Sequence, residues 1–205
     1  MNGRGIVLTV LVALFCCLSS YANITNVWYR DDGDGAFNCS NPGDWSGTPT
    51  NELSLGVAGK QCWEPGHLLL DVYTDSAEDP TLKIDNSIDN DTSFAWTTFT
   101  VNIYMATNFS LSNVNVSTPS DWSVVNYNTN STWNGSQYVA TVVYDTGPSI
   151  TVSNSIEFGY WVKFSGSPAY TITQEMIPVP EPSSLALVAM GGLFLARFAL
   201  RRGRK

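Results

Sequence analysis

The stretch IEFGYWVKF, residues 156–164, alternates between apolar side chains and other side chains along its whole length. Successive side chains of an extended strand point to opposite faces, so one face of this stretch is uniformly apolar. The apolar set consists of Ile156, Phe158, Tyr160, Val162 and Phe164. The opposite set consists of Glu157, Gly159, Trp161 and Lys163. This alternation predicts an antiparallel strand that packs one face on a hydrophobic core.

The same alternation recurs before and after this stretch. It is clearest at residues 99–105, and weaker runs occupy residues 67–73, 81–84, 110–116, 122–127, 137–144, 149–152 and 169–177. Turn-forming sequences separate the runs, and Asn134-Gly135 indicates a hairpin between 128–132 and 137–144. No segment from 23 to 177 shows a convincing helical period. We therefore predict an all-β domain, an antiparallel β-sandwich of immunoglobulin-like or jelly-roll type.

The N-terminus has the three parts of a secretory signal peptide. Arg4 supplies a positive charge, residues 6–18 are mostly apolar, and small residues precede a cleavage site after Ala22. We therefore predict a signal peptide at residues 1–22. Cleavage of this peptide would remove two of the four cysteines. The remaining two would lie in an exported protein, in a compartment where disulfides persist.

Residues 23–66 differ from the rest of the domain because they are rich in Gly, Asp, Asn and Pro. This composition predicts loops rather than strands. The two remaining cysteines, Cys39 and Cys62, are expected to form a disulfide that holds these loops together. The bond would close a loop of about 24 residues and stabilise the fold by about 3 kcal/mol.

The C-terminus combines three unlike features in a fixed order. The motif Pro180-Glu181-Pro182 is followed by an apolar segment at 184–200 and then by a basic cluster. The residues of that cluster are Arg201, Arg202, Arg204 and Lys205. Because prolines interrupt regular structure, residues 176–182 are expected to be a linker. The basic cluster is expected to stay in the cytoplasm, which makes 184–200 a predicted transmembrane helix and places the domain at 23–177 outside.

This order of features resembles the PEP-CTERM sorting signal of bacterial surface proteins over residues 178–205. The resemblance implies processing near the Pro-Glu-Pro motif by an exosortase, a membrane enzyme. It also implies delivery to the cell surface or to the extracellular polysaccharide matrix, after an association with the membrane that is at least transient. The mature protein would then end between Pro180 and Ser183. The resemblance concerns routing and implies no activity for the domain at 23–177.

The charges of the chain are unevenly distributed. The net charge is −8, with 18 acidic residues against 10 Lys and Arg. All acidic residues except Glu181 lie within 23–177, where the cations are Arg30, Lys60, Lys83 and Lys163. Such a domain repels phosphate groups, which excludes nucleic acid and anionic lipid as partners. The charge is compatible with divalent cations and with neutral glycans.

The acidic turn formed by Asp31, Asp32 and Asp34 is one candidate site. Carboxylates on a glycine-rich turn suit Ca²⁺, but Ala36 stands where an EF-hand loop would place its third ligand. We favour a solvated turn that binds no metal, with calcium as the alternative and no other cofactor. His67 is the only histidine of the chain, so a zinc site is not expected.

Two tryptophans form a second candidate site, because flat aromatic faces can stack on sugar rings in a ligand site with a few polar groups. Trp161 falls on the polar side of its strand, and Trp133 adjoins the predicted hairpin turn. Both are candidate contacts to a glycan. Packing of these side chains in the core is the alternative, and it is the more common role of tryptophan in a sandwich.

Catalytic chemistry finds little support in the sequence. A serine nucleophile has no base to use besides His67, and no spacing of carboxylates marks a glycosidase pair. We therefore predict an exported cell-surface or matrix protein whose ectodomain is structural or binding and is not an enzyme. The alternatives are a carbohydrate-binding module or adhesin that uses exposed tryptophans, with extracellular polysaccharide as its partner, and a secreted hydrolase.

Overall fold

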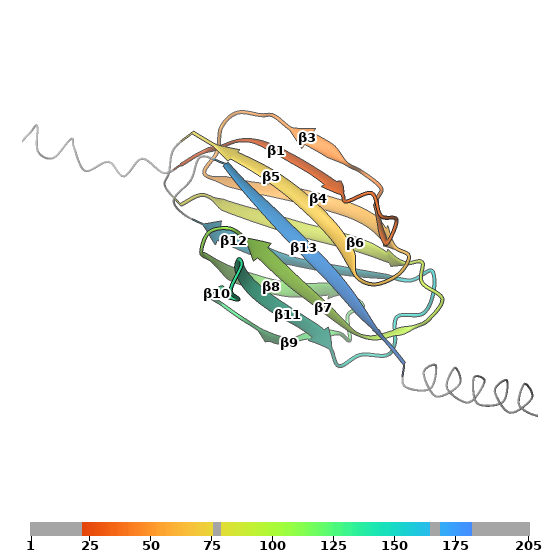
Figure 1. Ribbon diagram of the computed structural model, residues 1–205. Coiled ribbons are helices and arrows are strands. Elements are labelled where there is room, and N and C mark those ends of the chain that lie inside the picture. Colours follow the sequence, from red (N-terminus) through yellow and green to blue (C-terminus); the bar gives the residue numbers. More distant parts are fainter. Residues whose placement is uncertain (1–21, 76–78, 165–168, 182–205) are drawn as a thin grey trace, which may run out of the picture.

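The computed structural model describes residues 22–75, 79–164 and 169–181, which form strands β1 to β13 and no helix. Two sheets pack face to face, so the predicted all-β sandwich is confirmed (Figure 1). The predicted transmembrane helix, the basic cluster and all but the last residue of the predicted signal peptide lie outside the described residues. Within the described ranges, no helix is long and apolar enough to cross a bilayer.

The larger sheet has eight strands in the order β10-β11-β7-β13-β5-β1-β3, with β9 also paired to β11. Its strands are β1 (Ile24–Asp31), β3 (Gly43–Trp45), β5 (Gly66–Thr74), β7 (Trp96–Met105), β9 (Ser123–Tyr127), β10 (Thr132–Trp133), β11 (Tyr138–Asp145) and β13 (Ala169–Pro180). The predicted hairpin at Asn134-Gly135 joins β10 to β11, and Gly135 adopts a φ of +104° that favours glycine.

The smaller sheet has five strands in the order β2-β4-β6-β12-β8. Its strands are β2 (Phe37–Cys39), β4 (Glu52–Gln61), β6 (Thr81–Asn90), β8 (Phe109–Thr118) and β12 (Ser155–Phe164). Among the strand pairs of the described residues, only β4 and β6 run parallel. The sandwich is therefore mostly antiparallel, as predicted, and this one parallel pair arises because the chain crosses to the larger sheet as β5 between the two strands and returns in the same direction.

The core lies between the sheets and contains the apolar side of each alternating strand. Phe158 of β12 contacts Phe99 of β7 and Tyr144 of β11, with ring centroids 5.6 Å and 5.0 Å apart. A buried polar link also joins the sheets, because the Tyr160 hydroxyl donates to Oε1 of Gln174. The alternation in residues 156–164 therefore positions both the apolar core and its polar centre.

The prediction that residues 23–66 form loops is wrong. This region contains β1 to β4, and β4 shows a strict alternation of exposed and covered side chains. The alternation is hard to recognise in the sequence because three of the four residues at 56–59 are small, namely Gly56, Ala58 and Gly59. Strand pairing with β2 and β6 stabilises this glycine-containing segment despite its low intrinsic strand propensity.

The predicted disulfide between Cys39 and Cys62 does not form, and both thiols are free. Cys39 pairs with Gly59 across β2 and β4, whereas the backbone amide of Cys62 bonds to the carbonyl of Ala36. The cysteines are therefore offset by three strand residues, or about 10 Å. A disulfide requires Cα atoms within about 7 Å, so the strand register keeps these two thiols apart.

The predicted linker at 176–182 is also wrong over most of its length. β13 continues to Pro180 in the middle of the larger sheet, where Pro180 pairs with Trp96. The amide of Glu181 donates to the carbonyl of Ala95 at 3.2 Å. The described chain therefore enters and leaves the sandwich at opposite ends, and its last strand reaches the Pro-Glu-Pro motif without an intervening linker (Figure 1).

Candidate functional site

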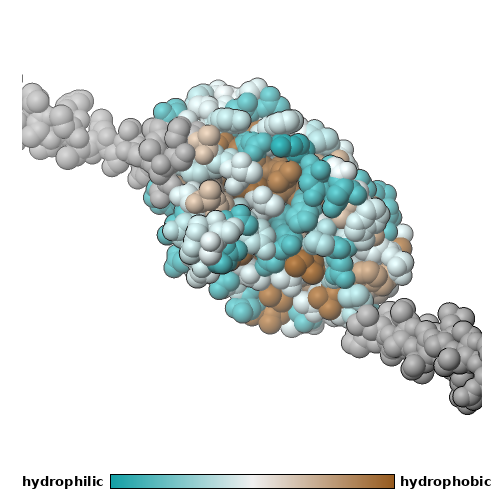
Figure 2. Space-filling model, in the orientation of Figure 1, coloured by the Kyte–Doolittle hydropathy of each residue, from teal (hydrophilic) through white to brown (hydrophobic). Residues whose placement is uncertain are grey.

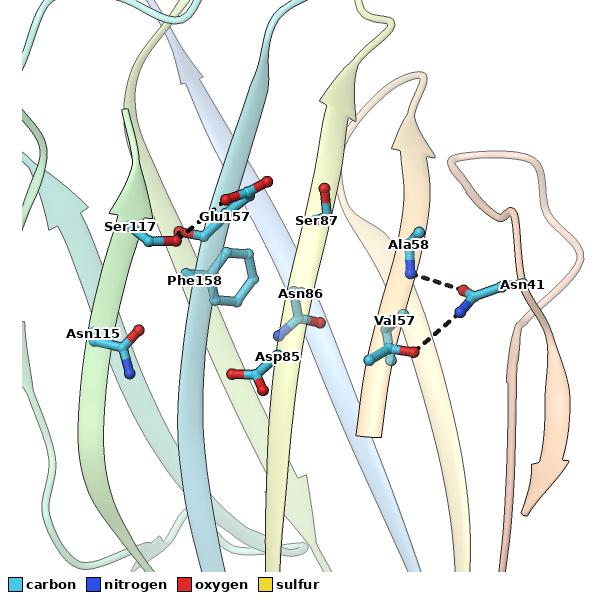
Figure 3. A pocket seen from close by; sticks show the side chains of 11 residues that line it. Asn41, Val57, Ala58, Asp85, Asn86, Ser87, Asn115, Ser117, Glu157 and Phe158 are labelled. Atoms are coloured by element: carbon cyan, nitrogen blue, oxygen red, sulfur yellow. Dashed lines mark hydrogen bonds between the residues drawn. The ribbon is translucent and has the colours of Figure 1, made fainter. Parts of the chain in front are cut away.

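A hollow of about 450 Å³ lies on the outer face of the smaller sheet (Figure 3). Strands β4, β6, β12 and β8 form its floor, and the loop after β2 forms one edge. The polar side chains that line it belong to Asn41, Asp85, Ser87, Asn115, Ser117 and Glu157. The hollow is therefore an open surface depression in which polar side chains stand around a mostly apolar floor.

Strand register explains the shape of this hollow, because it aligns the outer residues of the four strands in rows. The middle row consists of Gly56, Asp85, Gly159 and Asn115. One flanking row consists of Ser54, Lys83, Trp161 and Ser112, and the other of Ala58, Ser87, Glu157 and Thr118. Gly56 and Gly159 contribute no side chain to the middle row, and the Asp85 carboxylate lies over Gly159. A Cβ atom on Gly159 would lie 2.6 Å from Oδ1 of Asp85, so this position requires glycine unless Asp85 moves.

The acidic side chains of the hollow are held by polar neighbours. Oε2 of Glu157 accepts hydrogen bonds from the hydroxyls of Thr118 at 2.8 Å and Ser117 at 3.3 Å. Oδ2 of Asp85 lies 2.6 Å from Nζ of Lys83. These contacts fix two carboxylates beside hydroxyl and amide groups, which together can bind a ligand that carries many hydroxyls.

Asn41 closes the edge of the hollow that lies next to β4. Its side-chain amide donates to the carbonyl of Gly56 at 3.0 Å, and its Oδ1 accepts from the amide of Ala58 at 2.7 Å. Figure 3 shows this side chain reaching from its loop toward the strand. The two hydrogen bonds anchor the loop, so this wall of the hollow is fixed before any ligand arrives.

The two predicted tryptophans lie on different sheets. Trp161 is half-buried on the outer face of β12, two residues from Gly159 and therefore directly beside the hollow. Trp133 is 56% exposed at the edge of the larger sheet, and its ring meets that of Tyr138 edge to face at 5.2 Å. They cannot form one site, and Trp161 is the one that shares a face with the polar rows.

The three aspartates of the acidic turn between β1 and β2 do not point toward one common site, as the calcium alternative would require. Oδ1 and Oδ2 of Asp31 accept hydrogen bonds from the amides of Gly33 at 3.1 Å and Cys39 at 2.9 Å, so this carboxylate stabilises the turn. Asp32 and Asp34 instead converge with His67, at the start of β5, where their ligand atoms lie within 4.8 Å of one another. Sequence reasoning included Asp31 and omitted His67, because only the pairing of β1 with β5 brings His67 beside the turn.

The sorting region begins within the folded domain. Residues 178–205 match the family model described as the PEP-CTERM protein-sorting motif, and the first residues of the match are the end of β13. Neither a search of curated proteins nor a search of solved structures found a match. The matched range contains the Pro-Glu-Pro motif, the apolar segment at 184–200 and the basic cluster that follows it. The chain therefore carries a PEP-CTERM protein-sorting motif, which implies an exported protein that an exosortase sorts.

Proposed function

We propose that the ectodomain binds a polysaccharide on the outer face of the smaller sheet, without catalysis, and that it does so at the cell surface or in the extracellular matrix. The observation that carries this proposal is the placement of Trp161 beside the row that contains Gly56 and Gly159. A sugar ring stacked on the indole would extend over this row, within reach of the side chains of Asp85 and Asn115. The proposal also accounts for the routing, because the sorting motif implies export.

The chemistry of the three rows supports a polyhydroxylated ligand. Carboxylate oxygens of Asp85 and Glu157 accept hydrogen bonds, whereas the hydroxyls of Ser87 and Ser117 both donate and accept. The hollow is open along the sheet, which suits an extended chain better than an isolated small molecule. Because the ectodomain is strongly acidic, we propose that the bound polysaccharide is not anionic.

A binding experiment with two matched tryptophan variants tests this function. Trp161→Ala and Trp133→Ala each remove one indole, but only the first lies beside the hollow. Full-length protein in detergent would be applied to a glycan array and to insoluble polysaccharides. We expect Trp161→Ala to reduce affinity by about 5- to 150-fold, since stacking of one ring on an aromatic side chain is worth about 1–3 kcal/mol in base-stacking sites. Trp133→Ala is expected to bind like the unchanged protein.

Two results would contradict the binding proposal. Absence of retention on every glycan would leave a purely structural role for the ectodomain. Equal loss in both variants would show that the outer face of the smaller sheet is not the binding surface. The fluorescence spectrum and melting temperature of each variant control for unfolding.

Glycoside hydrolysis is the second candidate, because two carboxylates line the same hollow. Glu157 pairs with Ser87, two residues from Asp85 along β6, and such diagonal neighbours lie about 7–8 Å apart. Inverting glycosidases place their carboxylates about 6.5–9.5 Å apart. However, a catalytic acid needs an apolar pocket, whereas Asp85 contacts Lys83 and Glu157 contacts two hydroxyls. Release of reducing ends from a bound polysaccharide, lost in Glu157→Gln, would favour hydrolysis over binding alone.

A further inference from the structure

His67 lies on the outer face of the larger sheet, at the point where β5 begins beside the turn from β1 to β2. This face is mostly hydrophilic, with separate apolar areas (Figure 2). The imidazole and the carboxylates of Asp32 and Asp34 each place one ligand atom within 4.8 Å of the other two. The group combines a nitrogen donor with two oxygen donors from separate parts of the chain, and so differs from a simple run of acidic residues.

The Nδ1 atom of His67 has no hydrogen-bond partner among the described residues, although it is shielded from solvent. Oδ2 of Asp32 lies 3.0 Å from it, which is an ion-pair contact only when the imidazole is protonated. On a neutral imidazole without a proton at Nδ1, this contact brings two lone pairs together, and a cation bound by both atoms would relieve it. Two ligand atoms of a tetrahedral zinc site, with bonds of about 2.0–2.2 Å, are themselves about 3.3–3.6 Å apart. The contact between Nδ1 and Oδ2 is within a few tenths of an ångström of that spacing, so a small side-chain movement would let both atoms bind one ion.

The other imidazole nitrogen faces a carboxylate that is itself fixed. Nε2 of His67 lies 3.8 Å from Oε1 of Glu175, the residue paired with it on β13. Oε2 of Glu175 accepts hydrogen bonds from the Tyr104 hydroxyl at 2.7 Å and the Asn102 amide at 2.8 Å. Metal-binding histidines commonly direct their second nitrogen toward a carboxylate, which fixes the tautomer and the ring orientation.

Tyr104 and Asn102 hold the Glu175 carboxylate in place beside the imidazole of His67. Desolvation, followed by the hydrogen bond and the charge of Glu175, raises the pKa of Tyr104 to about 12. The phenol therefore stays protonated at neutral pH and continues to donate to Glu175. Asn102 is held in turn, because its Oδ1 accepts from the Thr141 hydroxyl at 2.7 Å. A series of polar contacts thus runs from Thr141 through Asn102 and Glu175 to the Nε2 side of the imidazole.

We propose that Asp32, Asp34 and His67 bind one divalent transition-metal ion, with Glu175 as the positioning residue for the imidazole. The donor set favours Zn²⁺ or a similar ion over Ca²⁺, because imidazole nitrogen is a preferred ligand of transition metals and calcium selects oxygen. Bound metal would connect the turn after β1 to the start of β5. This site lies on the opposite sheet from the proposed polysaccharide surface, so the two proposals can fail independently.

Thermal unfolding of full-length protein in detergent, after treatment with a chelator, tests the site. Addition of ZnCl₂ is expected to raise the melting temperature by several degrees, since a ligand that binds only the folded state stabilises it. His67→Gln is expected to abolish the rise, and Asp34→Asn to weaken the Zn²⁺ affinity at least tenfold by calorimetry. Asp44→Asn removes an exposed carboxylate of the same sheet outside the group and should behave like the unchanged protein.

Glu175→Gln provides a separate test of positioning. It is expected to weaken Zn²⁺ binding about tenfold while the three ligands remain in place. The proposal is overturned if Zn²⁺ causes no shift and no binding heat, if His67→Gln retains full affinity, or if Ca²⁺ stabilises the protein as strongly as Zn²⁺. Calorimetry of the unchanged protein keeps the test decisive even where a variant folds poorly.

Discussion

The hydroxyl of Tyr160 donates to Oε1 of Gln174, and Nε2 of Gln174 donates to Oδ1 of Asn86 at 3.2 Å. All three side chains are buried between the sheets. Burial raises the pKa of Tyr160 far above its ordinary value of 10.0, so the phenol remains a donor at neutral pH. Tyr144 is also fully buried, but its hydroxyl has no partner among the described residues. The two tyrosines therefore offer a matched comparison of one paired and one unpaired hydroxyl.

Removal of the Tyr160 hydroxyl is expected to destabilise the fold, whereas removal of the Tyr144 hydroxyl is not. Tyr160→Phe should lower the free energy of unfolding by about 1–3 kcal/mol, because Gln174 loses its donor within the core. Tyr144→Phe should leave that free energy unchanged or raise it, since it removes a buried group that forms no hydrogen bond. Urea unfolding of both variants measures the difference. Equal destabilisation by the two substitutions would contradict the importance of the polar link.

Two neighbouring strands, β2 and β4, determine the state of the cysteines. Their register places Cys39 opposite Gly59 and sets Cys62 beyond the end of the pair. We expect both thiols to be alkylated by iodoacetamide in denaturant without reductant, as read by mass spectrometry. In the native protein Cys39 should react slowly, because burial raises the pKa of its thiol and the thiolate is the reactive form. Recovery of a linked Cys39–Cys62 peptide would contradict this register.

The elements differ in how well the sequence predicts them. β7 and β12 alternate clearly and were predicted, because each has a full apolar face of large side chains. β4 was missed because its small residues weaken the same pattern, and the parallel pairing of β4 with β6 depends on a crossover through the other sheet. Pairing partners that lie far apart in the chain leave no local trace in the sequence.

The candidate sites show the same limit. Trp161 could be assigned to the outer face from alternation alone, whereas its neighbours Lys83 and Ser112 belong to strands far away in the sequence. The group formed by Asp32, Asp34 and His67 likewise depends on how β1 pairs with β5. Residue types indicated the chemistry, but only the long-range register identified which residues meet.

At the scale of the whole molecule, the last described strand ends inside the sorting motif, because β13 extends to Pro180 and the motif begins at residue 178. Because β13 ends at Pro180, processing just after this residue would leave every strand intact. We predict that protein isolated from the cell surface ends between Pro180 and Ser183 and keeps the melting temperature of the full-length chain. Mass spectrometry of the intact surface protein measures the end. Surface material that retains Arg201 to Lys205 would contradict this prediction.

The position of β13 links the integrity of the larger sheet to the sorting motif. It is the last strand of the described residues, yet it lies between β7 and β5 in the larger sheet. Without residues 169–180, that sheet would consist of two separate halves. Cleavage of the chain before β13 would therefore divide the sheet, whereas cleavage after Pro180 would leave both halves joined.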